Sequence, residues 1–136
     1  MKLKDISQLL KLWEEATLEI ENPEREIYEA EKMLLLNPSS CFIAVDGEEI
    51  IGSIFGIFNG RRAWIYHVAV HTKWQKQGIG KTLILKTEMA FEKLGATRIN
   101  LWVELNNLKV ISFYKKLGYL AYEPGSVLMK KELLTI

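Results

Sequence analysis

The stretch from Val68 to Ile84, VAVHTKWQKQGIGKTLI, joins an apolar segment to an amphipathic one through a charged loop. Its glycines, Gly78 and Gly80, stand just where the second segment starts. Glycine has no Cβ, so it permits left-handed backbone and lets a ligand approach the chain closely. A helix that begins there presents free backbone N–H groups and the positive end of its dipole. The stretch therefore predicts a strand, a loop and a helix whose junction binds an anion.

Two familiar phosphate-binding motifs do not fit this loop. A dinucleotide fingerprint needs a third glycine where Leu83 stands, and a P-loop needs its first glycine where Gln75 stands. What remains is Gln75 followed by glycines three and five positions later. We expect the backbone N–H groups of residues 77–81 to converge on one pyrophosphate.

The other elements alternate along the chain without linkers or repeats. Two helices come first: Asp5 is the predicted cap of one, and Asn22 with Pro23 starts the other, which ends before Pro38. Three strands joined by Asp-Gly and Asn-Gly hairpin turns follow, at 41–46, 48–58 and 61–70. After the loop, we expect a helix closed by Gly95, a strand at 98–104, a helix at 108–117 and a last strand at 127–133.

This order predicts an α/β (or α+β) fold in which helices flank a mixed, mostly antiparallel central sheet. The 136 residues, 49% of them apolar, suffice for a single domain, 1–136. A net charge of +1 gives no reason to expect nucleic acid or membrane as a partner. The N-terminus lacks a signal peptide, so a cytoplasmic location is expected. Cys41 is the only cysteine, and we expect it to be buried and no metal site to form.

A second motif, NLKVISFYKKLGY, runs from Asn107 to Tyr119. Together with the glycine loop it resembles the Gcn5-related N-acetyltransferase (GNAT) family. That family has a Q/R-x-x-G-x-G/A loop after its fourth strand, and later an Asn before a helix ending in an aromatic-Tyr-x-x-Leu-Gly-aromatic signature. The matching residues here are Gln75, Gly78, Gly80, Asn107, Phe113, Tyr114, Leu117, Gly118 and Tyr119.

The resemblance implies direct transfer of an acetyl group from acetyl-coenzyme A to an amine in a ternary complex. The pantetheine arm would pair with the strand at Val68, Ala69 and Val70, and the Val70 N–H would stabilise the oxyanion. Tyr114 would protonate the departing thiolate. The implied cofactor-binding residues are Val68, Ala69, Val70, Gln75, Lys76, Gln77, Gly78, Ile79, Gly80, Lys81, Asn107 and Tyr114.

The family does not fix the general base. Glu104, which ends the predicted strand at 98–104, ranks first, His67 ranks second, and a water chain is a third possibility. His71, in the loop, is expected to be exposed.

One departure from the family is that only MKLK precedes Asp5, so the first strand must be very short or missing. A homodimer could cover the edge that this leaves open. Glutamates dominate residues 11–32, whereas Lys and Arg dominate residues 60–131. Because the acidic part lies where the family binds its acceptor, we expect a cationic small-molecule or peptide amine. The alternative function is a non-catalytic acyl-coenzyme A-binding regulatory module of the same fold.

Overall fold

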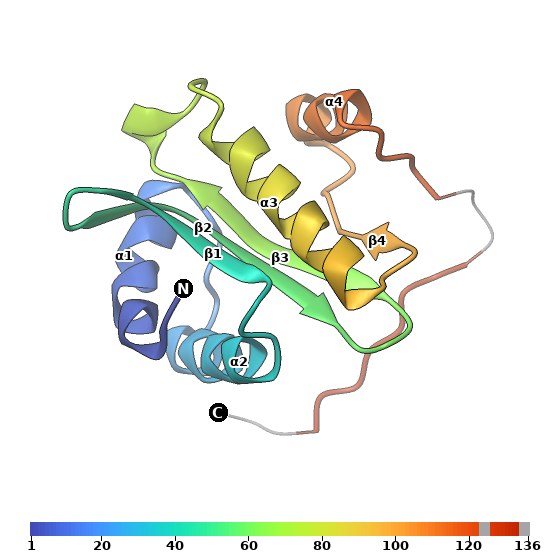
Figure 1. Ribbon diagram of the computed structural model, residues 1–136, viewed down its shortest axis with the longest axis horizontal. Helices are drawn as coiled ribbons and strands as arrows, with labels where there is room; N and C mark the ends of the chain where they lie inside the picture. The colour runs from blue at the N-terminus through green and yellow to red at the C-terminus, as the bar shows by residue number, and fades with distance from the viewer. Residues whose placement is uncertain (123–125, 134–136) are drawn as a thin grey trace. The chain divides into compact units, whose positions relative to one another are not determined.

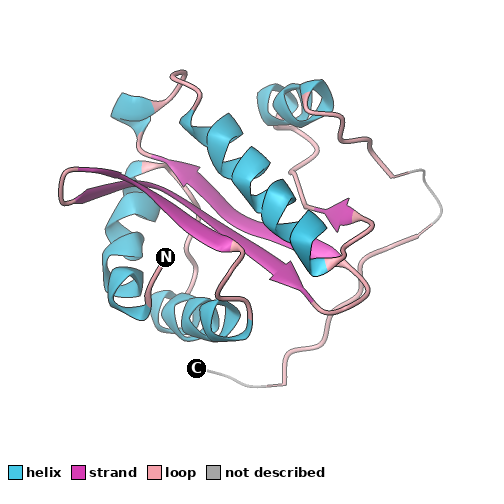
Figure 2. Cartoon of the chain, viewed as in Figure 1, coloured by secondary structure: helices cyan, strands magenta, loops and turns pink. Residues whose placement is uncertain are grey.

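The computed structural model describes residues 1–122 and 126–133 of the chain. Its contacts form two compact units, Met1–Leu101 and Trp102–Ile136. Figures 1 and 2 show the helices and strands of each. Within the described residues, no helix has the length and apolar character needed to cross a bilayer.

Two helices open the first unit, as the sequence predicts. α1 (Ile6–Glu15) follows a short 3-10 helix, η1 (Leu3–Asp5). The Asp5 carboxylate does not cap α1; it accepts a hydrogen bond from the Lys2 backbone N–H at 2.7 Å. α2 (Pro23–Leu36) starts as expected, because the Asn22 side chain accepts from the Arg25 N–H at 3.1 Å.

The sheet has the order β1-β2-β3-β4. β1 (Cys41–Asp46), β2 (Glu49–Phe58) and β3 (Ala63–Val70) form the predicted antiparallel meander, and β4 (Ile99–Asn100) adds to β3 in parallel. The sheet is therefore mixed and mostly antiparallel, as predicted.

The alternation of side chains along β2 assigns the helices to opposite faces of the sheet. Gly52 and Gly56 point to α3 (Ile79–Leu94), where a Cβ on Gly56 would lie only 2.6 Å from Thr87 Cγ2. Ser53 and Phe55 point the other way, toward Trp13 of α1. Figure 1 shows the result: α3 lies along one face of the sheet and α1 with α2 along the other. The buried cluster on the second face includes Leu9, Leu12, Trp13, Ala30, Leu34, Phe55 and Ala69.

Three strand predictions need comment. The expected short or missing first strand is confirmed, because η1 takes its place and β1 is an edge of the sheet. The predicted strand at 98–104 was too long, since β4 ends at Asn100. The predicted last strand at 127–133 was wrong: these residues, all described, have no strand pairing.

The second unit contains α4 (Leu108–Lys116). The Asn107 side chain caps it by accepting from the Val110 N–H at 3.4 Å. Gly118, with a φ of 96°, turns the chain directly after the helix. The predicted helix at 108–117 is thus confirmed, and Asn107 has a structural role at its start.

Candidate active site

β3 carries a bulge in the middle of the expected cofactor strand. Tyr66 pairs with Phe55 and Ala69 pairs with Ser53, so His67 and Val68 together lie opposite one residue of β2. His67 takes a φ of 50°, in the left-handed region. A bulge of this kind re-aims a side chain and increases the local twist. Here it turns the imidazole toward the face of the sheet that carries α1.

A buried hydrogen-bond chain from α1 holds this bulge. Trp13 Nε1 donates to Ser53 Oγ at 3.1 Å, and Ser53 Oγ donates to the His67 carbonyl at 3.0 Å. Trp13 and Ser53 are both fully buried. Because both donors are out of water, losing either bond would leave a costly unpaired group. The strained backbone at His67 is therefore stabilised by the first helix.

Beyond the bulge, β3 has an edge that β4 does not cover. β4 pairs only with Ala63 and Trp64. Val70 pairs with Gly52, and the neighbouring bond runs from the His71 N–H to the Ile51 carbonyl. In an antiparallel ladder this makes Val70 a non-hydrogen-bonded position, whose N–H and C=O point away from β2. Gln75 Nε2 donates to that carbonyl at 2.9 Å, which leaves the Val70 N–H directed to the uncovered edge.

The glycine loop continues from this edge into α3. Gly78 is the N-cap of α3 with a φ of 85°, no side chain caps the helix, and its first turn holds no acidic residue. Lys76 also has a positive φ, of 65°. The first-turn N–H groups therefore lack a side-chain acceptor, and the helix dipole adds positive potential. A Cβ on Gly78 would stand in open space, so the loop leaves room for an anion beside the helix start.

His67 itself is paired. Its Nε2 lies 2.6 Å from Glu26 Oε2 in the first turn of α2, and each side chain is 23% exposed. The Trp13 ring packs edge-on against the imidazole, with a centroid distance of 4.7 Å. The structure thus brings together a histidine and a carboxylate that stand 41 positions apart in the sequence.

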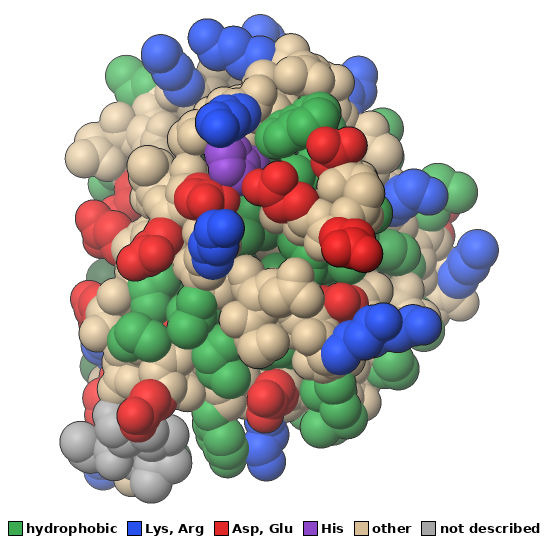
Figure 3. Space-filling model, turned by 90° about the vertical axis from the view of Figure 1, so that its left-hand side faces the viewer, with side chains coloured by type: hydrophobic (Ala, Val, Ile, Leu, Met, Phe, Trp, Pro, Cys, Tyr) green, Lys and Arg blue, Asp and Glu red, His purple; other side chains and the backbone are tan. Residues whose placement is uncertain are grey.

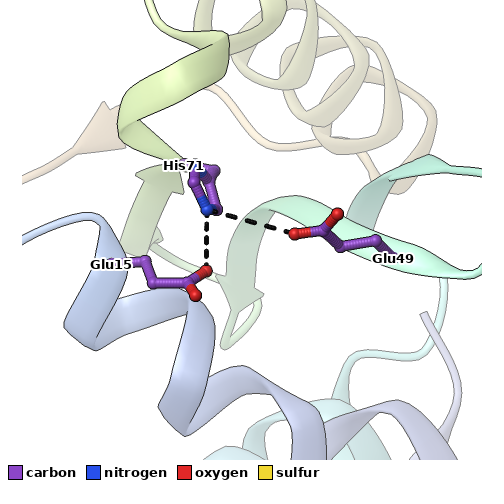
Figure 4. A group of neighbouring side chains, drawn as sticks. All are labelled: Glu15, Glu49 and His71. Carbon is purple, nitrogen blue, oxygen red and sulfur yellow. Dashed lines mark ion pairs between the residues drawn. The ribbon is translucent and has the colours of Figure 1, made fainter.

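The expectation that His71 is exposed was wrong. Its side chain is 8% exposed, with Nε2 2.9 Å from Glu15 Oε2 and 4.0 Å from Glu49 Oε1 (Figure 4). The ligand atoms of these three residues lie within 4.8 Å of one another, close enough to hold a metal ion. However, His71 Nδ1 accepts from the Lys73 N–H at 3.1 Å, so the neutral ring carries its proton on Nε2. A metal would need the lone pair of that nitrogen, so the geometry favours a hydrogen-bonded clamp between α1, β2 and the loop.

Tyr114, Asn107 and Glu104 belong to the second unit. Tyr114 is 8% exposed, and burial raises its pKa to about 12. Its ring makes edge contacts with Phe113 and Tyr119 at centroid distances of 5.1 and 5.5 Å. Glu104 does not end a strand as predicted: it is exposed and its carbonyl accepts from the Asn107 N–H at a turn.

Comparison with known proteins decides the family. The acetyltransferase (GNAT) family matches residues 6–119. The chain belongs to this family. An acetyltransferase of Sodalis glossinidius (strain morsitans) is 33% identical over 96% of this chain and 90% of its own length. An acetyltransferase of Pectobacterium atrosepticum is 32% identical over 85% of this chain and 81% of its own.

Solved structures agree with this GNAT assignment. An aminoglycoside acetyltransferase from an uncultured soil metagenomic sample, in complex with trehalose, is 26% identical with a TM-score of 0.69, over 98% of this chain and 91% of that one. Ard1 from Thermoplasma volcanium shares the fold with a TM-score of 0.78 at 21% identity, over 90% of this chain and 81% of its own.

The GNAT resemblance predicted from the glycine loop and the Asn107–Tyr119 motif is therefore confirmed. In this GNAT chain the predicted cofactor residues Val68–Val70 and Gln75–Lys81 both lie in the first unit, separated by His71 and the short 3-10 helix η2 (Thr72–Trp74). Sequence analysis missed the partner of His67, Glu26. The only local signal was a glutamate in a first helical turn, which a favourable helix dipole explains equally well.

Proposed function

We propose that this chain is an N-acetyltransferase that moves an acetyl group from acetyl-coenzyme A directly to a primary amine while both are bound. The uncovered β3 edge, which leads straight into the uncapped start of α3, is the observation that carries the proposal. Coenzyme A presents a thioester, a chain of amides and a pyrophosphate in that order. The chain offers strand-edge groups and then helix N–H groups in the same order. Because the family match runs through both units, we propose that residues 1–136 act as one acetyltransferase domain.

In this proposal each binding role falls on backbone groups of the first unit. The edge at Val68–Val70 pairs with the pantetheine amides, and the Val70 N–H donates to the acyl oxygen as negative charge develops there. The amides of Gln77–Lys81 hold the pyrophosphate, and the side chains of Lys76 and Lys81 add positive charge nearby. Gln75 Nε2 already donates to the Val70 carbonyl, so at Val70 the edge offers a ligand its N–H alone.

Direct transfer is supported by the state of Cys41. It is the only cysteine of the chain, it is 2% exposed, and burial raises the pKa of its thiol to about 11. A cysteine nucleophile needs an accessible, low-pKa thiolate. Cys41 has neither property, which speaks against an acetyl-cysteine intermediate.

Tyr114 is the proposed acid. With a pKa of about 12 its phenol stays protonated at physiological pH and can donate a hydrogen bond. A thiol has an ordinary pKa of about 8.5, so complete proton transfer from this phenol is uphill. We therefore expect Tyr114 to stabilise the leaving sulfur by hydrogen bonding as the C–S bond breaks. We rank His67 first as the proposed general base, because its imidazole is held in place by Glu26. Glu104 ranks second, because its side chain is exposed at a turn.

The proposed acceptor is a cationic amine. Glu19, Glu21 and Glu24, in the connection from α1 to α2 and the start of α2, are exposed. The side of the molecule with α1 and the β1–β2 hairpin shows acidic side chains around a histidine (Figure 3). Exposed carboxylates attract cations within about 8 Å at physiological salt. The 26% identical structure is named an aminoglycoside acetyltransferase, which also supports an amine acceptor. We further propose that the protein acts in the cytoplasm, because the acyl donor is an intracellular thioester. We also propose a homodimer in which the partner covers the edge strand β1.

A binding experiment tests the cofactor site. Gly80 has no positive φ, so Gly80→Val leaves the backbone unstrained but puts a branched side chain into the anion space. We expect the affinity for acetyl-coenzyme A, measured by calorimetry, to fall by about tenfold or more, or ~1.4 kcal/mol. Lys86→Val, at an exposed position of the same helix, is the matched control and should bind like the wild type. Equal affinities of the two variants would refute the pyrophosphate assignment.

A further inference from the structure

The pair of His67 and Glu26 is built more tightly than a surface ion pair. The distance between His67 Nε2 and Glu26 Oε2 is 2.6 Å, and each side chain is about three-quarters buried, at 23% exposed. The two residues come from different elements, β3 and α2, so the contact depends on the folded structure. Such short hydrogen bonds to a charged group are the strong ones.

The contact also fixes which nitrogen of the ring carries the proton. An ionised carboxylate only accepts hydrogen bonds, so Nε2 must donate. The lone pair of the neutral imidazole is then on Nδ1. No described residue hydrogen-bonds to Nδ1. Among the described residues every side-chain nitrogen or oxygen shielded from solvent has a partner, so Nδ1 is reached by solvent.

The surroundings leave the ring little freedom to turn. The rings of Trp13 and Phe55 pack edge-on against the imidazole, at centroid distances of 4.7 and 6.1 Å. Ser53 fixes the backbone of the bulge by donating a hydrogen bond to the His67 carbonyl. Among the described residues, Glu26 is the only charged side chain that pairs with the His67 imidazole. His67 directly precedes the strand segment Val68–Val70, which the proposed function assigns to the thioester arm.

We propose that Glu26 is the positioning residue of a catalytic pair in which His67 Nδ1 accepts the proton of the incoming amine. The inference rests on the proposed acetyl transfer. Nδ1 takes a proton from the ammonium, and the freed amine attacks the acyl carbon. The C–N bond forms and the C–S bond breaks. The sulfur leaves as the thiolate, which becomes the thiol by taking up the second amine proton by way of solvent. Glu26 keeps the Nε2 proton in place and stabilises the imidazolium until it releases its proton to solvent.

The pair can be tested without any turnover. In the wild-type protein, nitrogen-15 NMR of the two histidine rings should show the neutral His67 as the Nε2–H tautomer. In Glu26→Gln this preference should weaken, because a neutral amide accepts the Nε2–H hydrogen bond less strongly than a carboxylate does. A neutral His67 protonated on Nδ1 in the wild type would overturn the proposal, whether or not any acetyl acceptor is found.

Kinetics then tests the catalytic role. Glu26→Gln should lower kcat/KM for an amine acceptor by about 10- to 100-fold. Acetyl-coenzyme A affinity should stay unchanged, and Glu26→Asp should recover part of the rate. Glu29→Gln removes the same charge from the same helix at an exposed position, and should keep the wild-type kcat/KM. If Glu26→Gln and Glu29→Gln have equal kcat/KM, Glu26 has no positioning role.

Discussion

Tyr114 is a residue whose ionisation is coupled to folding. Burial raises its pKa from the ordinary 10 to about 12, so the folded state holds the phenolic proton more tightly than the unfolded state does. The resulting stability is fully present below pH 10 and is lost as the pH rises from 10 toward 12.

Tyr114→Phe keeps the ring and removes the ionisation. Between pH 9 and pH 11 we expect the wild type to lose about 1 kcal/mol more of its free energy of unfolding than the variant does. Denaturant titrations of both proteins at the two pH values measure this difference. Parallel losses in the two proteins would mean that the Tyr114 phenol ionises as freely as an exposed one.

The two histidines show what the sequence hides at this scale. Both were read from their neighbours in the chain, which made His67 a strand residue and His71 an exposed loop residue. Their actual partners, Glu26 and Glu15, come from helices far back in the sequence. Side-chain pairs that form only through tertiary packing leave no local pattern, so neither pair could be predicted.

At the scale of helices, strands and turns, the properties of adjacent residues predicted most of the elements that the structure contains. Hairpin turns at Gly47 and Gly60 and the left-handed end of α3 at Gly95 are properties of a few adjacent residues, and all were predicted. The length of the strand predicted at 98–104 was overestimated, because the apolar pattern of a strand does not indicate where pairing with the neighbouring strand ends. Residues 127–133 begin with a run of three apolar residues, yet pairing in a sheet requires a neighbouring strand, which a local pattern does not supply.

The contact between α3 and β2 gives a test at this scale. A Cβ on Gly56 would lie 2.5 Å from the Ser40 carbonyl oxygen, 2.6 Å from Thr87 Cγ2 and 2.9 Å from Phe91 Cζ. Gly56→Ala should therefore force the helix away from the sheet and destabilise the protein by about 1–3 kcal/mol.

Gly52→Ala is the matched control for this test. Gly52 lies on the same face of the same strand, but its nearest contact would be 3.1 Å, to the flexible end of Leu83. In thermal or denaturant unfolding, the free energy of unfolding of Gly56→Ala should be well below that of Gly52→Ala. The reverse order would contradict the close packing of α3 on β2.

The whole molecule combines an acidic side with a basic, glycine-rich junction. Exposed glutamates follow α1, whereas the start of α3 presents unpaired amides and has no acidic residue in its first turn. A net charge of +1 conceals this division. The separation would suit the two ligands of the proposed function, an anionic acyl donor and a cationic amine. It could be predicted from the sequence because it is a matter of composition.

The central claim is direct acetyl transfer from acetyl-coenzyme A to an amine, and initial-rate kinetics tests it most directly. Thiol release is measured while acetyl-coenzyme A and a polyamine such as spermidine are varied together, with the acetylated product identified by mass spectrometry. We predict release that depends on the amine and reciprocal plots that intersect, as a ternary complex requires. Parallel plots would contradict direct transfer, and binding of acetyl-coenzyme A without release in the presence of any amine would show a binding module instead of an enzyme.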